Sequence, residues 1–116
     1  MVMVAHVINN DFDTLPATLS YKTIQMLRNM GFDGVIISDS MDMIPIIGIY
    51  GIEKSVQMAI MAGNDILVFS NNLKFNKNRG SDINKMIVKM VKDGKIPKSR
   101  IKQSYRRIMN LKKHLK

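Results

Sequence analysis

Three short apolar runs, separated by segments with helical spacing, constrain the fold of this 116-residue chain more than any other feature. The runs are residues 1–7 (MVMVAHV), 34–38 (GVIIS) and 65–69 (DILVF). They are rich in Val and Ile and do not alternate cleanly, which is typical of strands covered on both faces of a parallel sheet. Strands that alternate with helices imply right-handed crossover connections. The sequence therefore predicts an α/β protein with a parallel sheet.

Two helices are expected between these runs. Ser20 can cap the first, which would carry Ile24, Leu27 and Met30 inward and end at Gly31. The second spans residues 53–62, places Val56, Ala59 and Ile60 on one face and stops at Gly63. Residues 8–19, after the first run, are expected to form a long loop.

Two more helices are expected after the third run and the polar loop 70–80 (SNNLKFNKNRG). Ser81 or Asp82 can cap a helix with apolar residues at i, i+3, i+4, i+7 and i+8, and Gly94 ends it. Pro97 suits the first turn of a last helix, with Ile101, Tyr105, Ile108 and Leu115 along one side. Three parallel strands leave two unpaired edges, so the chain is expected to be the end of a larger structure.

Composition narrows the possible functions. With no Cys and only two His, disulfides and thiolate metal sites are excluded, and a metal site is not expected. Hydrophobic residues make up 46% of the chain, as in a globular protein. No segment approaches the roughly 18 apolar residues of a membrane span, and the start lacks a signal peptide's basic region. We therefore expect no membrane partner, and a cytoplasmic location is the default.

The net charge of +9 is unevenly distributed. Residues 1–73 contain three basic and seven acidic residues, whereas residues 74–116 contain 15 basic and two acidic ones. Such asymmetry can indicate nucleic-acid binding, but it also arises when Lys and Arg form the solvated faces of helices. No base-reading motif or aromatic platform accompanies the charge, so we expect no nucleic-acid partner.

Polar residues follow each predicted strand, on the side where α/β proteins keep their binding sites. Asp39 ends the second strand and can be a nucleophile, a general base, a metal ligand, an acceptor for a ribose hydroxyl or merely a cap for the following turn. Asp42 is expected to be a loop residue facing solvent. His6, at the equivalent position after the first strand, is either a substrate contact or a hydrogen-bonded structural histidine.

The segment FDGVIISDSMDM (32–43) resembles the signature of glycoside hydrolase family 3, which runs roughly GFDGVVISDDLxM. Residues 2–20 are similar to the preceding strand and loop of the family's bacterial β-N-acetylhexosaminidase branch, approximately VMxAHVxYxxxDxxPATLS. MAGNDILVFSNN (61–72) resembles the branch's next strand, and IPKSRIKQSYRRIMNLK (96–112) its closing helix. These blocks cover most of the chain in the expected order.

The resemblance implies that residues 1–116 are the C-terminal portion of a (β/α)8 barrel, the last three βα units with strands six to eight. It also implies a retaining glycosidase acting on β-N-acetylglucosaminides, as in cell-wall sugar recycling, with no cofactor. Asp39 then matches the catalytic nucleophile of the family. His6 matches the histidine of the AH pair, and Met43 matches the last residue of the signature. We assign His6 and Met43 to substrate binding. Ser40 stands where the family commonly has a second Asp.

The branch's acid/base histidine with its aspartate partner, its sugar-binding Lys-His pair and its PGHG motif do not occur in these 116 residues. We therefore expect the chain alone to be inactive, as a fragment that requires a complementing N-terminal half. The alternative is a non-catalytic association module. It would pair through exposed strand edges or its basic C-terminal helices, as a homo-oligomer or with another chain.

Overall fold

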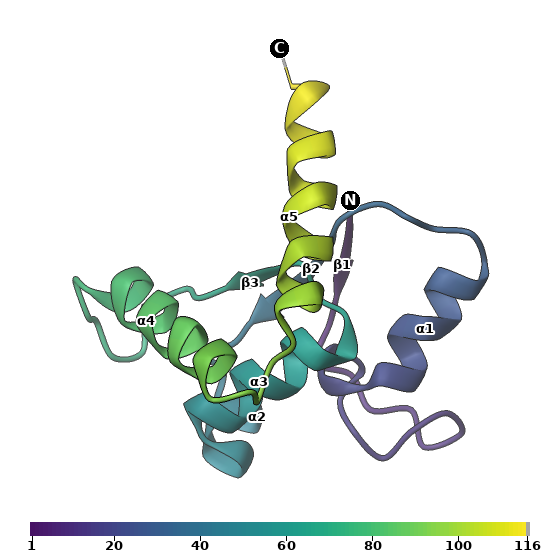
Figure 1. Ribbon diagram of the computed structural model, residues 1–116. Helices are drawn as coiled ribbons and strands as arrows, with labels where there is room; N and C mark the ends of the chain where they lie inside the picture. The colour runs from purple at the N-terminus through teal and green to yellow at the C-terminus, as the bar shows by residue number, and fades with distance from the viewer. Residues whose placement is uncertain (116) are drawn as a thin grey trace.

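A three-stranded parallel sheet forms the centre of the protein (Figure 1). The computed structural model describes residues 1–115. The strands are β1 (Val2–Val4), β2 (Ile36–Ser40) and β3 (Ile66–Val68), and β2 lies between the other two. Val2 pairs with Ile36 in β1–β2, and Ile37 with Ile66 in β2–β3, where the register shifts before Ser40. The predicted parallel α/β fold is confirmed.

Helices connect and follow the strands (Figure 1). They are the 3-10 turn η1 (Ala17–Leu19) and the α-helices α1 (Tyr21–Asn29), α2 (Ile44–Tyr50), α3 (Ile52–Ala62), α4 (Arg79–Lys92) and α5 (Lys98–Lys113). The Ser20 hydroxyl accepts a hydrogen bond from the Thr23 N–H, as predicted for the cap of α1. None of these helices has the length and hydrophobicity needed to cross a membrane, within the described residues.

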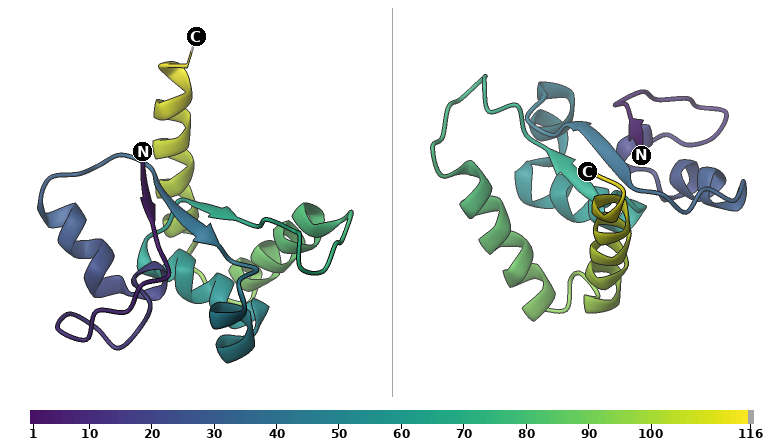
Figure 2. Two further views of the ribbon diagram at one scale, coloured as in Figure 1. Left: turned by 180° about the vertical axis from the view of Figure 1, so that it is seen from behind. Right: turned by 90° about the horizontal axis from the view of Figure 1, so that it is seen from above.

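The helices cover one face of the sheet. Ile36 packs with Ile24 of α1 and Ala62 of α3, and Leu67 packs against the core between α3 and α4. Because side chains alternate along a strand, Met3 and Ile37 point to the opposite face. Met3 is 62% exposed there. The left panel of Figure 2 looks onto this face, with α3 and α5 behind the strands. The expectation that both faces are covered is therefore wrong for the described chain.

Three sequence-based expectations about the helices differ from the structure. Met30, expected to point inward, is 79% exposed because α1 ends at Asn29 and Met30 is already its C-cap. The cap of α4 is Asn78 rather than Ser81 or Asp82, and its side chain makes no cap hydrogen bond. Helix α2 (Ile44–Tyr50) was not predicted, because the sequence analysis assigned no element to these residues.

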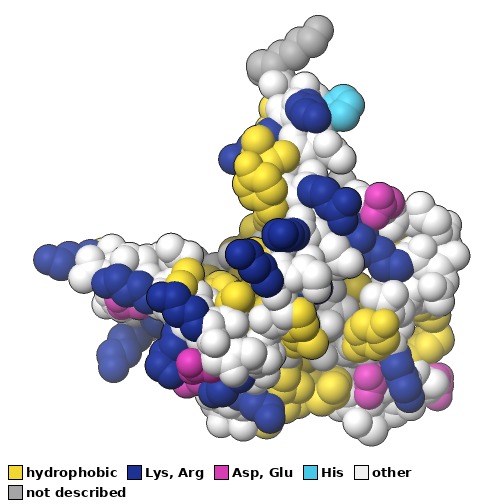
Figure 3. Space-filling view, in the orientation of Figure 1, with side chains coloured by type: hydrophobic (Ala, Val, Ile, Leu, Met, Phe, Trp, Pro, Cys, Tyr) yellow, Lys and Arg dark blue, Asp and Glu magenta, His cyan; other side chains and the backbone are white. Residues whose placement is uncertain are grey.

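Helix α5 contains no buried residue, and its C-terminal part projects away from the other helices (Figures 1 and 2). Figure 3 shows Lys and Arg side chains spread over α4 and along α5, as expected for solvated helix faces. Tyr105, expected on the apolar side of α5, is 63% exposed.

A buried acid at the amino end of β3 holds α5 to the sheet. The side chain of Asp65 has no exposed surface. Its carboxylate accepts hydrogen bonds from Arg28 (3.0 Å), Arg100 (3.2 Å), Arg107 (3.4 Å), the hydroxyl of Ser104 (2.7 Å) and the N–H of Ile36 (3.0 Å). We call these side chains of Asp65, Arg28, Arg100, Arg107 and Ser104 the Asp65 cluster. The cluster ties α1, β2 and α5 together below the sheet.

Candidate active site at the carboxyl ends of the strands

Asp39 lies near the end of β2 and has few protein contacts. Side-chain alternation places it on the same face as Ile37, the face that the helices leave uncovered. It is half-buried, and its carboxylate accepts a hydrogen bond from the N–H of Ser40 at 2.7 Å. Among residues 1–115, no cation forms an ion pair with this carboxylate. Asp39 is therefore open to a reaction partner and is not locked into a structural ion pair.

His6 joins the ends of β1 and β2. Its Nε2 lies 2.8 Å from the carbonyl oxygen of Ser40, and its Nδ1 lies 2.9 Å from the hydroxyl of Thr18. A carbonyl only accepts, so Nε2 must carry a proton. The Thr18 hydroxyl also lies 3.1 Å from the carbonyl oxygen of Val4.

The hydrogen bond from Nε2 of His6 to the carbonyl oxygen of Ser40 holds the backbone beside Asp39. The carbonyl oxygen of Ser40 also accepts from the N–H of Met43 at 3.2 Å. The carbonyl oxygen of Ser40, in the turn that follows Asp39, thus accepts hydrogen bonds from both His6 and Met43. Of the two readings of His6, the geometry supports a hydrogen-bonded residue next to the site; a substrate contact by His6 stays a prediction.

The expectation that Asp42 faces solvent is wrong. Asp42 is only 3% exposed. Its carboxylate accepts from the N–H of Asn71 at 2.8 Å and lies 3.5 Å from a terminal guanidinium nitrogen of Arg79. Asn71 adopts a left-handed backbone conformation, with φ of 56°. A buried carboxylate requires such partners, and they come from the loop after β3 and from the first residue of α4.

Arg79 was not singled out by the sequence. Its Nε is buried and has no hydrogen-bond partner among the described residues. The Arg lies 37 residues beyond Asp42 at the first position of α4, in a loop-to-helix segment crowded with other basic residues. Only the pairing with Asp42 distinguishes it.

Small polar side chains surround Asp39 at the carboxyl ends of β2 and β3. The Ser40 hydroxyl donates to the Ser70 hydroxyl at 2.9 Å, and Ser70 donates to Asn72 at 2.8 Å. Met43 is the N-cap residue of α2 and is 39% exposed. Within residues 1–115, no three acidic or histidine side chains gather closely enough to hold a metal ion. The carboxyl ends of the strands thus present one carboxylate without an ion pair, that of Asp39, surrounded by hydroxyl and amide groups.

Known proteins resemble the chain in sequence and in structure. Residues 1–111 match the model of the glycosyl hydrolase family 3 N terminal domain. A beta-hexosaminidase from Neisseria meningitidis serogroup C is 36% identical over 72 residues, which are 60% of this chain and 20% of that protein.

Two solved structures share the fold over nearly the whole chain. The beta-N-acetylglucosaminidase from Thermotoga maritima has a TM-score of 0.83 and 33% identity over 100% of this chain and 26% of its own. A family 3 beta-N-acetylglucosaminidase from Paenibacillus sp. str. FPU-7 has a TM-score of 0.82 and 34% identity, covering 96% of this chain and 21% of its own. The chain spans about a fifth to a quarter of the length of these relatives. It belongs to glycoside hydrolase family 3.

Proposed function

We propose that the chain supplies the last three βα units, with strands six to eight, of a (β/α)8 barrel in a retaining glycosidase that acts on β-N-acetylglucosaminides. The observation that carries the proposal is Asp39, a carboxylate near the carboxyl end of a strand on the uncovered face of the sheet. In a closed barrel that face becomes the interior, and strand-end residues face the active site. The unpaired edges of β1 and β3 would then be joined by further strands.

Asp39 is the proposed nucleophile. One of its carboxylate oxygens attacks the anomeric carbon, and the bond from that carbon to the leaving-group oxygen breaks. The leaving group takes a proton from a general acid, and a glycosyl ester on Asp39 remains. Water activated by the same group, now a base, hydrolyses the ester and returns the carboxylate. Ion pairing would reduce the nucleophilicity of the carboxylate, and Asp39 has no such pair among the described residues.

His6 and Met43 are the proposed substrate-binding residues. The side chain of Met43 is exposed beside the turn that follows Asp39 and offers an apolar surface for a sugar ring. Both ring nitrogens of His6 are already hydrogen-bonded, so a polar substrate contact by His6 requires it to exchange a partner. We propose that its main contribution is to hold the carbonyl of Ser40, and through it the backbone of Asp39.

We expect the chain alone to be inactive. The second histidine of the sequence, His114, caps α5 and lies against the carbonyl oxygen of Asn110, far along the chain from the proposed site. Loss of a general acid/base costs about 10²–10⁴-fold in rate. Loss of the remaining walls of the pocket adds to this, because substrate positioning is lost as well.

A hybrid enzyme tests the proposal. The matching quarter of the Thermotoga maritima beta-N-acetylglucosaminidase is replaced by this chain, and hydrolysis of an aryl N-acetyl-β-glucosaminide is followed. We expect turnover in the hybrid, none in the isolated chain, and loss of turnover with Asp39→Asn. Asp11→Asn is the matched control, since Asp11 is an exposed loop acid. Turnover that survives Asp39→Asn would refute the assignment of the nucleophile.

The unpaired strand edges also favour the second candidate function, a non-catalytic association module. This reading predicts that the isolated chain forms a defined oligomer and that Asp39→Asn leaves that oligomer unchanged. Sedimentation of the wild type and the variant distinguishes the two candidates. A monomer that also gives an inactive hybrid contradicts both.

A further inference from the structure

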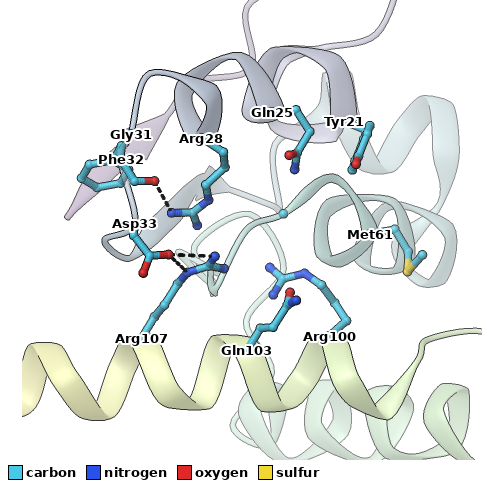
Figure 4. A pocket seen from close by; sticks show the side chains of 11 residues that line it. Tyr21, Gln25, Arg28, Gly31, Phe32, Asp33, Met61, Arg100, Gln103 and Arg107 are labelled. Atoms are coloured by element: carbon cyan, nitrogen blue, oxygen red, sulfur yellow. Dashed lines mark hydrogen bonds and ion pairs between the residues drawn. The ribbon is translucent and has the colours of Figure 1, made fainter.

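A polar pocket of about 520 Å³ lies at the opposite end of the strands from Asp39. It is formed between α1, α3 and α5, and three arginines line it: Arg28, Arg100 and Arg107. Figure 4 shows Arg28, from α1, facing Arg100 and Arg107, from α5, across the same space. Arg28 contacts the carbonyl oxygens of Phe32 and Gly34, which places the pocket at the amino end of β2. The proposed glycosidase site does not use it.

Positive charge exceeds negative charge in this pocket. The three guanidinium groups share one buried acid, Asp65, whose oxygens are also hydrogen-bonded to Ser104 and Ile36. The second acid, Asp33, pairs with Arg107 at 3.1 Å, but its side chain is 89% exposed. An exposed acid neutralises little charge, because water screens it. Burial and the neighbouring charge of Arg107 both lower the pKa of Arg28, as expected where guanidinium groups repel one another.

The arginines retain donors that no described residue uses. A guanidinium has five N–H groups. The hydrogen bonds of Arg28 use three of them, those of Arg100 four and those of Arg107 three. The side-chain amides of Gln25 and Gln103 line the same space. In Figure 4, Gln25 comes from α1 and Gln103 comes from α5, between Arg107 and Arg100. Guanidinium N–H groups without a partner among the described residues therefore line a pocket with a net positive charge.

We propose that this pocket binds a phosphate dianion, either free or as a phosphate monoester. Three oxygens and two negative charges match several guanidinium forks better than a monocarboxylate does. Arg107 is expected to exchange the exposed Asp33 for the phosphate, whereas Arg28 and Arg100 keep their buried partners. Met61, 41% exposed, and Tyr21, 61% exposed, stand at the same pocket and offer a surface for the organic part of a monoester. The proposal is independent of the glycosidase function.

Thermal unfolding and calorimetric titration of the full chain test this site. The probes are inorganic phosphate and phenyl phosphate, each compared with chloride at equal ionic strength. A ligand that binds only the folded state raises the midpoint temperature with concentration. We expect both phosphates to raise it and chloride to leave it unchanged. Tighter binding of phenyl phosphate identifies a monoester as the ligand, and equal binding identifies free phosphate. A response to phosphate no larger than the response to chloride would overturn the proposal.

Matched variants test whether phosphate binds in this pocket. Gln103→Glu adds a negative charge to the pocket without removing an arginine, and we expect phosphate binding to weaken at least tenfold. Lys102→Gln makes the same change in net charge at the neighbouring position of α5, outside the pocket, and should weaken binding less than twofold. Asp33→Asn removes the acid that competes for Arg107 and should tighten binding several-fold. Equal weakening by Gln103→Glu and Lys102→Gln would show that phosphate affinity depends only on the net charge of the protein. That result would refute binding in this pocket.

Discussion

Replacing Asp65 by Asn should strongly destabilise the protein. The Asp65 carboxylate is the only acid that contacts Arg28 and Arg100 in the described chain, and it also contacts Arg107. Both Arg28 and Arg100 have side chains only 11% exposed. The variant leaves their charges partly buried without a counter-charge. Removing one partner of such a buried ion pair typically costs about 3–5 kcal/mol.

That cost is large compared with the stability of a small domain, which is about 5–15 kcal/mol. Urea unfolding at pH 7, followed by far-UV circular dichroism, measures it directly. The matched control is Asp93→Asn, which removes the acid of an exposed pair with Lys89 on the surface of α4 and should leave the midpoint unchanged. A decrease of less than about 1 kcal/mol for Asp65→Asn would refute the reasoning, because it would mean that the guanidinium groups are well solvated without the acid.

The pH dependence provides a second test of the same cluster. Burial alone would raise the pKa of Asp65, but the hydrogen bonds from Ile36 and Ser104 and the charges of Arg100 and Arg107 lower it below its ordinary value. A carboxylate with a lowered folded-state pKa stabilises the protein fully above its unfolded pKa of about 3.9. This contribution is lost as the pH falls through the folded-state pKa. Asp65→Asn should therefore flatten the stability profile below about pH 4, and an unchanged profile would contradict the assigned cause.

Two further changes test how the helices begin and end. Ser20→Ala should cost about 1 kcal/mol in urea unfolding, because the cap of α1 loses its acceptor, whereas Ser81→Ala should cost nothing measurable, since Ser81 is not a cap. Equal effects of the two would contradict the capping assignment. Gly63→Ala should be clearly destabilising, because Gly63 has φ of 126° and a Cβ there would lie 2.7 Å from Cγ2 of Ile24. Gly80→Ala, where a Cβ meets nothing within 4 Å, is the control and should be neutral or stabilising in the same unfolding assay.

The order of strands and helices could be predicted from the sequence because each element carries a local signal. Val and Ile runs mark the strands, Ser20 marks the start of α1, and Gly63 marks the end of α3. The exposed face of the sheet could not be predicted in this way. A strand whose Val and Ile residues pack against helices on one face only can have the same composition as a strand buried on both faces.

The surroundings of Asp42 show a second limit of sequence reasoning. An acid in a loop faces solvent unless distant residues supply partners, and its own neighbours do not reveal them. The partners here are the N–H of Asn71 and the guanidinium of Arg79, which become adjacent only when the loop after β3 folds back to the end of β2. Contacts between residues about 30 positions apart leave no periodic pattern in the sequence.

Asp39 and Asp65 illustrate how hydrogen-bond partners distinguish an acid with few contacts from a structural one. Asp39 lies at the carboxyl end of β2, where α/β proteins keep their binding sites, and Asp65 immediately precedes β3. Asp65 lies at an amino end, and both of its oxygens are engaged by guanidinium, hydroxyl and backbone donors. Proton transfer or nucleophilic attack by it would require the loss of several of these contacts. Asp39 lies at a carboxyl end and accepts from its neighbour Ser40, with no ion pair among residues 1–115. An incoming electrophile would therefore displace little at Asp39, which is why we propose that acid as the nucleophile.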